Sequence, residues 1–177
     1  MPNIIQSTFR RDGNYIPITY GGITTTTTKN LTANNTTGTV PLFTVTGQVE
    51  VTALFGIVTT ALGNNTVAFW RTNDGTTQNA ITLATGTTLT DAIAGAVISK
   101  KAGVGTALAL TAGTSAIVSE SATAGALNFQ DFTIAANPLA TSNIEFVYTT
   151  TDTPTTGTIQ FSIRWAPLTS TSNVTAL

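Results

Sequence analysis

Residues 42–62, LFTVTGQVEVTALFGIVTTAL, alternate between apolar and polar side chains with a period of two. Successive side chains of a β-strand point to opposite faces, so this pattern predicts strands with one buried face, whereas a helix would scatter the apolar set. Gly47 interrupts the alternation, and its wide choice of φ favours a turn or bulge that divides the stretch into two strands. The predicted inward residues are Phe43, Val45, Val49, Val51, Ala53, Phe55 and Ile57, and the opposite face is polar until it turns apolar at Leu54 and Val58.

Two hairpins are predicted from the segments that alternate best. Residues 66–72 follow a Gly-Asn-Asn turn and are expected to pair with the opening stretch, with Trp70 in the core. Residues 143–149 and 158–168 predict a second, aromatic-rich hairpin. Residues 42–72 and 143–168 would then form the two layers of a sandwich. The inward residues of the second hairpin are Ile144, Phe146, Tyr148, Ile159, Phe161, Ile163 and Trp165.

The remaining segments predict weaker elements. Residues 78–84 and 127–136 are each expected to contain a strand, and residues 102–125 two short strands with glycine turns. Residues 88–99 fit a loop with a short strand or a single helical turn. The five threonines at 24–28 fit an edge strand or a linker, and their low complexity leaves both interpretations open.

The composition favours a single all-β domain with a neutral surface. Charged residues make up 8% of the 177 residues, where about a quarter is usual, and close to a quarter of the chain is threonine. The β-branched threonine side chain favours extended backbone, and its hydroxyl suits the wet face of a sheet without adding charge. Few charges remain to protect strand edges from pairing, so we expect another subunit or a larger assembly to cover them.

Residues 1–22 read as an arm and not as part of the core. They alternate poorly and contain two prolines and three glycines. A frayed terminus is the simpler interpretation. The alternative is a docking arm, because Arg10 and Arg11 lie close to Phe9 and Tyr15, and arginine beside aromatic residues is typical of interfaces. We therefore predict an N-terminal extended docking arm over residues 1–22 and a β-sandwich domain over residues 23–177.

The residue types that most catalytic and metal sites need are missing or scattered. The chain has no histidine and no cysteine, which removes the commonest general base, the thiol nucleophile and imidazole or thiolate metal ligands. The eight acidic residues are dispersed, so only folding could bring two carboxylates together. Residues 12–14 and 73–75 offer oxygen ligands like half of a calcium loop, but no acid follows to complete one. We expect neither an enzyme nor a bound cofactor or metal.

The charge distribution and hydropathy exclude further classes of partner. The net charge is −1 and the seven basic residues are mostly scattered, so no nucleic-acid footprint is present. The N-terminus lacks the apolar segment of a signal peptide, and no apolar run approaches the roughly 20 residues of a membrane helix. We expect no nucleic acid, no membrane and no small-molecule substrate.

Three short motifs in chain order resemble small structural proteins of tailed bacteriophages. They are RDGNYIPI at 11–18, TTGTVPLFTVTG at 36–47 and RWAPLTS at 164–170. Such proteins place a short N-terminal arm before a β domain and close on a W-x-P-L-S-like tail. The resemblance covers both ends and the middle of the chain, and Thr169 stands where serine is usual in the tail.

The resemblance implies a structural protein of the virion, most plausibly a capsid decoration (cement) protein. It would bind the major capsid protein on the capsid exterior as a homotrimer, in an antiparallel β-sandwich or jelly-roll-like fold. The alternative in the same virion is a head-fibre or tail-fibre module that binds a host receptor through Trp70 or loop threonines. A secreted adhesin or pilus-like subunit is the rival from another class. The proposed docking residues are Phe9, Arg10, Arg11, Asp12, Asn14, Tyr15 and Pro17.

Overall fold

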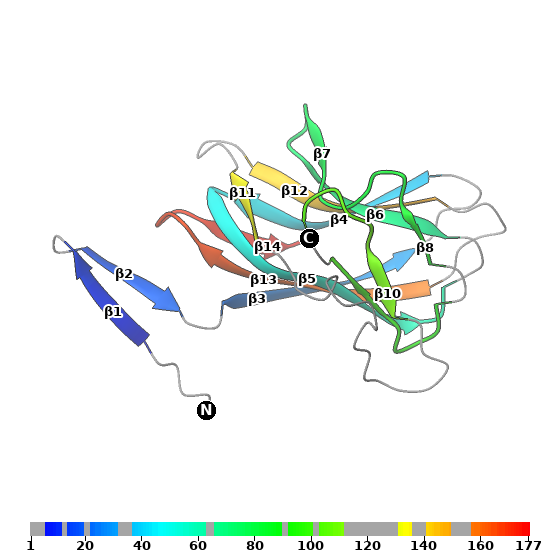
Figure 1. Ribbon diagram of the computed structural model, residues 1–177, viewed down its shortest axis with the longest axis horizontal. Coiled ribbons are helices and arrows are strands. Elements are labelled where there is room, and N and C mark those ends of the chain that lie inside the picture. The colour runs from blue at the N-terminus through cyan, green and yellow to red at the C-terminus, as the bar shows by residue number, and fades with distance from the viewer. Residues whose placement is uncertain are drawn as a thin grey trace.

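The computed structural model consists of two antiparallel β-sheets packed face to face, with a separate hairpin at the N-terminus (Figure 1). The structure describes residues 6–11, 14–19, 22–31, 37–62, 66–89, 92–100, 103–111, 131–135, 141–149 and 157–177. These residues contain strands, turns and loops but no helix. The predicted all-β sandwich is therefore confirmed.

The first sheet, which we name sheet I, has six strands in the order β10-β9-β5-β13-β3, and β11 also pairs with β5. Its two long central strands, β5 and β13, pair with each other over most of their length. The bounds are β3 (Ile23–Leu31), β5 (Gln48–Thr60), β9 (Val97–Ser99), β10 (Ala109–Thr111), β11 (Phe132–Ala135) and β13 (Gly157–Pro167).

The second sheet, sheet II, has six strands in the order β14-β4-β12-β6-β7, and β8 also pairs with β6. The central strand β12 pairs with β4 on one side and with β6 on the other. The bounds are β4 (Thr37–Thr46), β6 (Val67–Asn73), β7 (Gln78–Ala80), β8 (Thr87–Thr88), β12 (Thr141–Thr149) and β14 (Asn173–Ala176).

One hydrophobic core fills the space between the sheets. Its centre is aromatic: Trp70 from β6 and Phe146 from β12 meet Phe161 from β13, and all three are fully buried. The prediction that Trp70 belongs to the core is confirmed, which removes it as a surface anchor for a receptor. The predicted inward residues Ile144, Phe146, Tyr148, Ile159, Phe161, Ile163 and Trp165 are likewise all buried.

The predicted pairing of the strands is wrong, although most of the strands themselves are present. Residues 42–62 form β4 and β5 on either side of Gly47, but β4 belongs to sheet II and β5 to sheet I. The chain changes sheets at Gly47, whose φ of 69° is one that glycine adopts at little cost. Strand β6 pairs with β12 and not with β5, and β12 and β13 also lie in opposite sheets. Each predicted hairpin is therefore split between the two layers.

The inward face of β5 changes phase halfway along the strand. Val49 and Val51 are buried as predicted, but Ala53, Phe55 and Ile57 are only half-buried, and Leu54 and Val58 take the inward positions instead. The pairing with β13 shows the cause, since Arg164 lies opposite Ala53 and Trp165 opposite Val51. Thr52 is thus an extra residue in a β-bulge, and a bulge of one residue moves every later side chain to the other face.

The weaker elements are shorter than predicted. Residues 78–84 contribute only the three residues of β7, and residues 88–99 contain the short strand β9. Residues 102–125 contain β10, and residues 127–136 contain β11; residues 112–130 and 136 lie outside the described residues. The threonine run is an edge strand, β3, which settles the choice between strand and linker.

Candidate docking surface

The predicted docking arm contains a β-hairpin. Strands β1 (Gln6–Arg11) and β2 (Asn14–Thr19) pair antiparallel with each other and join neither sheet I nor sheet II. Figure 1 shows this hairpin to one side of the packed sheets, beyond the start of β3. The arm is thus a two-stranded ribbon that precedes the sandwich.

The hairpin register brings most of the predicted docking residues together along the backbone. Arg10 lies opposite Tyr15, and Arg11 lies opposite Asn14. Phe9 pairs with Ile16 and Pro17 with Thr8, so the two arginines occupy the end of the ribbon at which β1 ends and β2 begins. Asp12, also predicted for docking, lies outside the described residues.

Strand β3 follows the hairpin and forms one edge of sheet I. It pairs with β13 along all nine of its residues. Its side chains alternate: Thr24, Thr26 and Thr28 are exposed, whereas Thr25 and Thr27 are half-buried toward sheet II. The threonine run therefore supplies a neutral outer row and an inner row that contacts the other sheet.

The inner row of β3 joins the two sheets by side-chain hydrogen bonds to β14. The Thr25 hydroxyl donates to the Val174 carbonyl oxygen at 3.2 Å and accepts the Trp165 indole N–H at 3.1 Å. The Thr27 hydroxyl and the Lys29 ammonium both donate to the Leu177 carbonyl oxygen, at 3.0 and 2.7 Å. The bonds to Val174 and Leu177 hold the edges of the two sheets together without using the backbone of β3, whereas the bond from Trp165 joins β13 to β3 within sheet I.

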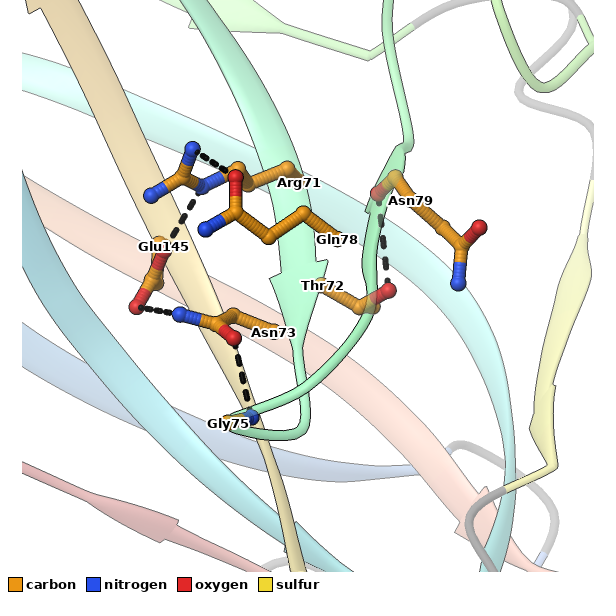
Figure 2. A network of polar contacts seen from close by, with 7 residues as sticks. All are labelled: Arg71, Thr72, Asn73, Gly75, Gln78, Asn79 and Glu145. Carbon is orange, nitrogen blue, oxygen red and sulfur yellow. Dashed lines mark hydrogen bonds and ion pairs between the residues drawn. The ribbon is translucent and has the colours of Figure 1, made fainter.

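A polar network that the sequence did not reveal spans β6, β7 and β12 (Figure 2). Arg71 Nε donates to Glu145 Oε2 at 2.7 Å, with side chains that are 18% and 9% exposed. Arg71 Nη1 donates to Gln78 Oε1 at 2.6 Å, and Asn73 Nδ2 donates to Glu145 Oε1 at 2.9 Å. Both carboxylate oxygens of Glu145 are therefore satisfied, and the network ties three neighbouring strands of sheet II together.

The turn after β6 is stabilised by the residues that the sequence singled out at 73–75. Asn73 Oδ1 accepts the Gly75 backbone N–H at 2.9 Å. Asp74 Oδ1 accepts the N–H groups of Thr76 and Thr77 at 2.9 and 2.6 Å, and these bonds lower the pKa of the Asp74 carboxyl below its usual value. The carboxylate oxygen is occupied by the turn, in line with an Asx-type turn and not half of a calcium site.

A cavity of about 280 Å³ lies next to this turn, between the edge of sheet II and β11 of sheet I. Thr72, Asn79 and Ser142 line one part of it, and Phe132 and Ile134 another. Asp74 is the one acidic residue among its lining residues, so this cavity offers no pair of carboxylates for acid–base chemistry.

Lys100 is a second feature that no sequence pattern indicated. Its side chain is fully buried, and its ammonium lies 4.9 Å from the centre of the Phe132 ring. Burial lowers the pKa of the Lys100 ammonium, and the nearby Asp131 carboxylate opposes this by raising it. An ammonium over an aromatic face in a desolvated site is a favourable cation–π arrangement.

The described residues contain neither a cluster of metal ligands nor a membrane-spanning helix. In that part of the chain, no three His, Cys, Asp or Glu side chains gather closely enough to hold a metal ion. None of its segments is a helix of the length and apolarity that crossing a membrane requires. The features with a geometry suited to binding are thus the hairpin, the β3 edge and the faces of the sheets.

Comparison with protein-family models, with curated proteins and with solved structures finds no match to this chain.

Proposed function

We propose that this chain is a structural virion protein that decorates the capsid exterior. In this role it binds the major capsid protein and stabilises the shell as a homotrimer. The observation that carries the proposal is the N-terminal hairpin, which belongs to neither sheet of the sandwich and has Arg10 and Arg11 at the end of β1. Arginines on an arm that precedes a separate rigid domain are well placed to contact a partner surface.

The neutral surface of the sandwich supports the same role. The exposed residues of β3 are uncharged, namely Ile23, three threonines and an asparagine, and Phe55 and Ile57 stay half-exposed on the outer side of sheet I. Such a surface is better suited to a protein that stays bound in an assembly than to one that diffuses freely, because few charges oppose association. In a trimer, three weak docking contacts would add through their high effective concentration.

The direct test is binding to purified particles that lack this protein. Removal of residues 1–20 is expected to abolish binding, and the double substitution Arg10→Ser and Arg11→Ser to weaken it strongly. Arg164→Ser is the matched control, because Arg164 is an exposed arginine on β13 and distant in sequence from the arm. Undiminished binding of the truncated chain to such capsids would contradict the proposal.

A head-fibre or tail-fibre module that binds a host receptor is the alternative within the virion. Copy number on purified particles separates the two functions. A decoration protein is expected in many copies spread over the shell, whereas a fibre module is expected in a few copies at one vertex or on the tail. Mass spectrometry or quantitative gel analysis against the major capsid protein provides this ratio.

A further inference from the structure

Strand β3 is the longest open strand edge among the described residues. The other end strands in the two sheet orders are β10 and β7, with three residues each, and β14, with four. Short edge strands are one of the ways in which proteins avoid unwanted pairing. Within the part of the chain that the structure describes, β3 has nine residues and pairs only with β13, so one long row of its backbone N–H and C=O groups faces away from the sheet.

This edge lacks the features that normally protect a long edge strand. Residues 24–28 contain no charge and no proline, and their pairing with β13 shows no register shift that would mark a bulge. The one charged residue of the strand, Lys29, directs its ammonium to the Leu177 carbonyl oxygen of the opposite sheet, 2.7 Å away. A long, neutral and regular edge is the kind of surface to which an additional strand binds by backbone hydrogen bonds.

The N-terminal hairpin needs a further strand or a packing surface to be stable. Among the strands that the structure describes, β1 and β2 pair only with each other, through six residue pairs. An isolated two-stranded hairpin is at best marginally stable in water, and a third strand or a packing surface is needed to hold it. In the described part of each copy, the six-residue strands of the ribbon and the nine-residue edge of β3 both lack a further strand.

From these two features we propose that the open edge of β3 binds the N-terminal hairpin of a second copy, which extends sheet I across the contact between copies. The donor surface differs from the acceptor surface, so the contact is head to tail, and such contacts close into rings when the rotation between copies permits. Three copies would close the ring in the proposed trimer. The pairing uses the hairpin backbone and requires no particular side chain.

The inference goes beyond the proposed function because it concerns contacts between copies of this chain alone. It is tested on the purified protein without any particle. We expect the full chain to be a trimer by light scattering and the chain without residues 1–19 to be a folded monomer, whose thermal unfolding no longer depends on protein concentration. The double substitution Arg10→Ser and Arg11→Ser is expected to keep the trimer, which separates this inference from capsid binding.

Cross-linking identifies the surfaces in contact, and the absence of native cysteine makes it unambiguous. One protein carries Thr8→Cys in β1, and a second carries a cysteine at Thr24, Thr26 or Thr28 of β3. We expect mixed disulfide dimers for at least one of the three β3 positions. The control position is Asn79 in β7, which is an exposed residue on the edge strand of the other sheet and is expected to give none.

Amide hydrogen exchange distinguishes pairing between copies from pairing within one copy. In the full chain, the outward amides of β3 are expected to be protected from exchange. This protection should be lost on dilution and on removal of residues 1–19. Protection that is independent of concentration would mean that the hairpin folds back on its own β3, and would overturn the inference. A monomeric full chain would also overturn it, as would a trimer that persists without residues 1–19, which would indicate pairing through another surface.

Discussion

The rings of Phe146 and Phe161 meet between the two sheets with their centres 4.9 Å apart and their planes tilted by 53°. Phe146 lies on β12 in sheet II and Phe161 on β13 in sheet I. Tilted aromatic pairs at this separation contribute about 0.5–1.5 kcal/mol beyond the burial of their area. This contact links the two layers at the centre of the core.

Removal of the Phe161 ring is expected to be among the most damaging changes in the protein. Phe161→Ala should lower the free energy of unfolding by about 3–5 kcal/mol, because it removes a fully buried ring and leaves a cavity that its neighbours fill only in part. Urea denaturation measures the loss. Phe55→Ala is the control, since Phe55 is half-buried on the outer side of sheet I, and it should cost clearly less. Equal losses for the two substitutions would contradict the described packing.

Trp70 is expected to tolerate phenylalanine far better than alanine. Its indole Nε1–H is buried and has no hydrogen-bond partner among the described residues, so the donor contributes nothing to offset its desolvation. Trp70→Phe should cost less than about 1.5 kcal/mol, because lost volume is partly offset by removal of this group. Trp70→Ala should cost about 3–5 kcal/mol. Thermal unfolding of both variants checks the difference, and a Trp70→Phe loss as large as that of alanine would indicate a partner for the indole.

The layered fold could be predicted from the sequence because alternation is a local signal. Strands β4, β5, β6, β12 and β13 all show it, and even the change of phase in β5 is visible where Leu54 and Val58 break the polar face. Strand pairing is different, since it depends on which distant segments pack together. The turn at Gly47 looks like that of a hairpin in the sequence, but here it carries the chain from one sheet to the other.

The polar sites were less predictable than the strands. Arg71 and Glu145 are 74 residues apart in the chain, and they become neighbours only because β6 pairs with β12 in one register. Lys100 follows a short apolar strand and looks like an ordinary surface lysine in the sequence. The local composition of the arm indicated a docking role. The hairpin register adds which of its residues lie opposite one another.

Gly47 is expected to resist substitution for two separate reasons. Its φ of 69° strains any residue with a Cβ by about 1–2 kcal/mol, and a Cβ here would also lie 3.1 Å from Ser172 Cα and Oγ. Gly75 separates the two effects, since its φ is 89° but nothing lies within 4 Å of its Cβ position. Gly47→Ala should therefore lower the unfolding midpoint more than Gly75→Ala does. The opposite order would mean that the backbone between β4 and β5 adjusts to a Cβ at Gly47 without a cost in stability.

Replacing one partner of the Arg71–Glu145 ion pair is expected to destabilise the protein, because the charge of the other partner stays largely buried without its counterion. Arg71→Met removes the guanidinium and leaves a largely buried carboxylate with Asn73 as its remaining side-chain donor among the described residues, which should cost about 1–3 kcal/mol. Adding Glu145→Gln in the same chain should recover much of this loss, because the remaining group is neutral. Chemical denaturation of the two single variants and the double variant gives the coupling energy. Additive losses would show that the two side chains do not interact in solution.

Control substitutions separate this effect from the loss of any arginine. Arg164 is exposed on β13, and its guanidinium forms no ion pair with the described residues. Arg164→Met should change the stability by no more than about 0.5 kcal/mol. A loss comparable to that of Arg71→Met would point to a general effect of charge.

Lys100 is expected to make the protein more stable as the pH rises through the alkaline range. Burial lowers the pKa of its ammonium in the folded state below the ordinary lysine value of about 10.4 that applies to the unfolded chain. Between these two pKa values the unfolded chain binds more protons than the folded protein, so the free energy of unfolding increases with pH in that interval. The stabilisation is complete above the unfolded pKa and is lost as the pH falls through the folded pKa.

Denaturant unfolding at a series of pH values, compared with Lys100→Met, isolates this contribution, which the methionine variant should lack. Asp131→Asn should lower the folded pKa further and widen the interval, because the Asp131 carboxylate favours the charged ammonium. A pH dependence that is the same with and without Lys100 would show that this ammonium keeps an ordinary pKa.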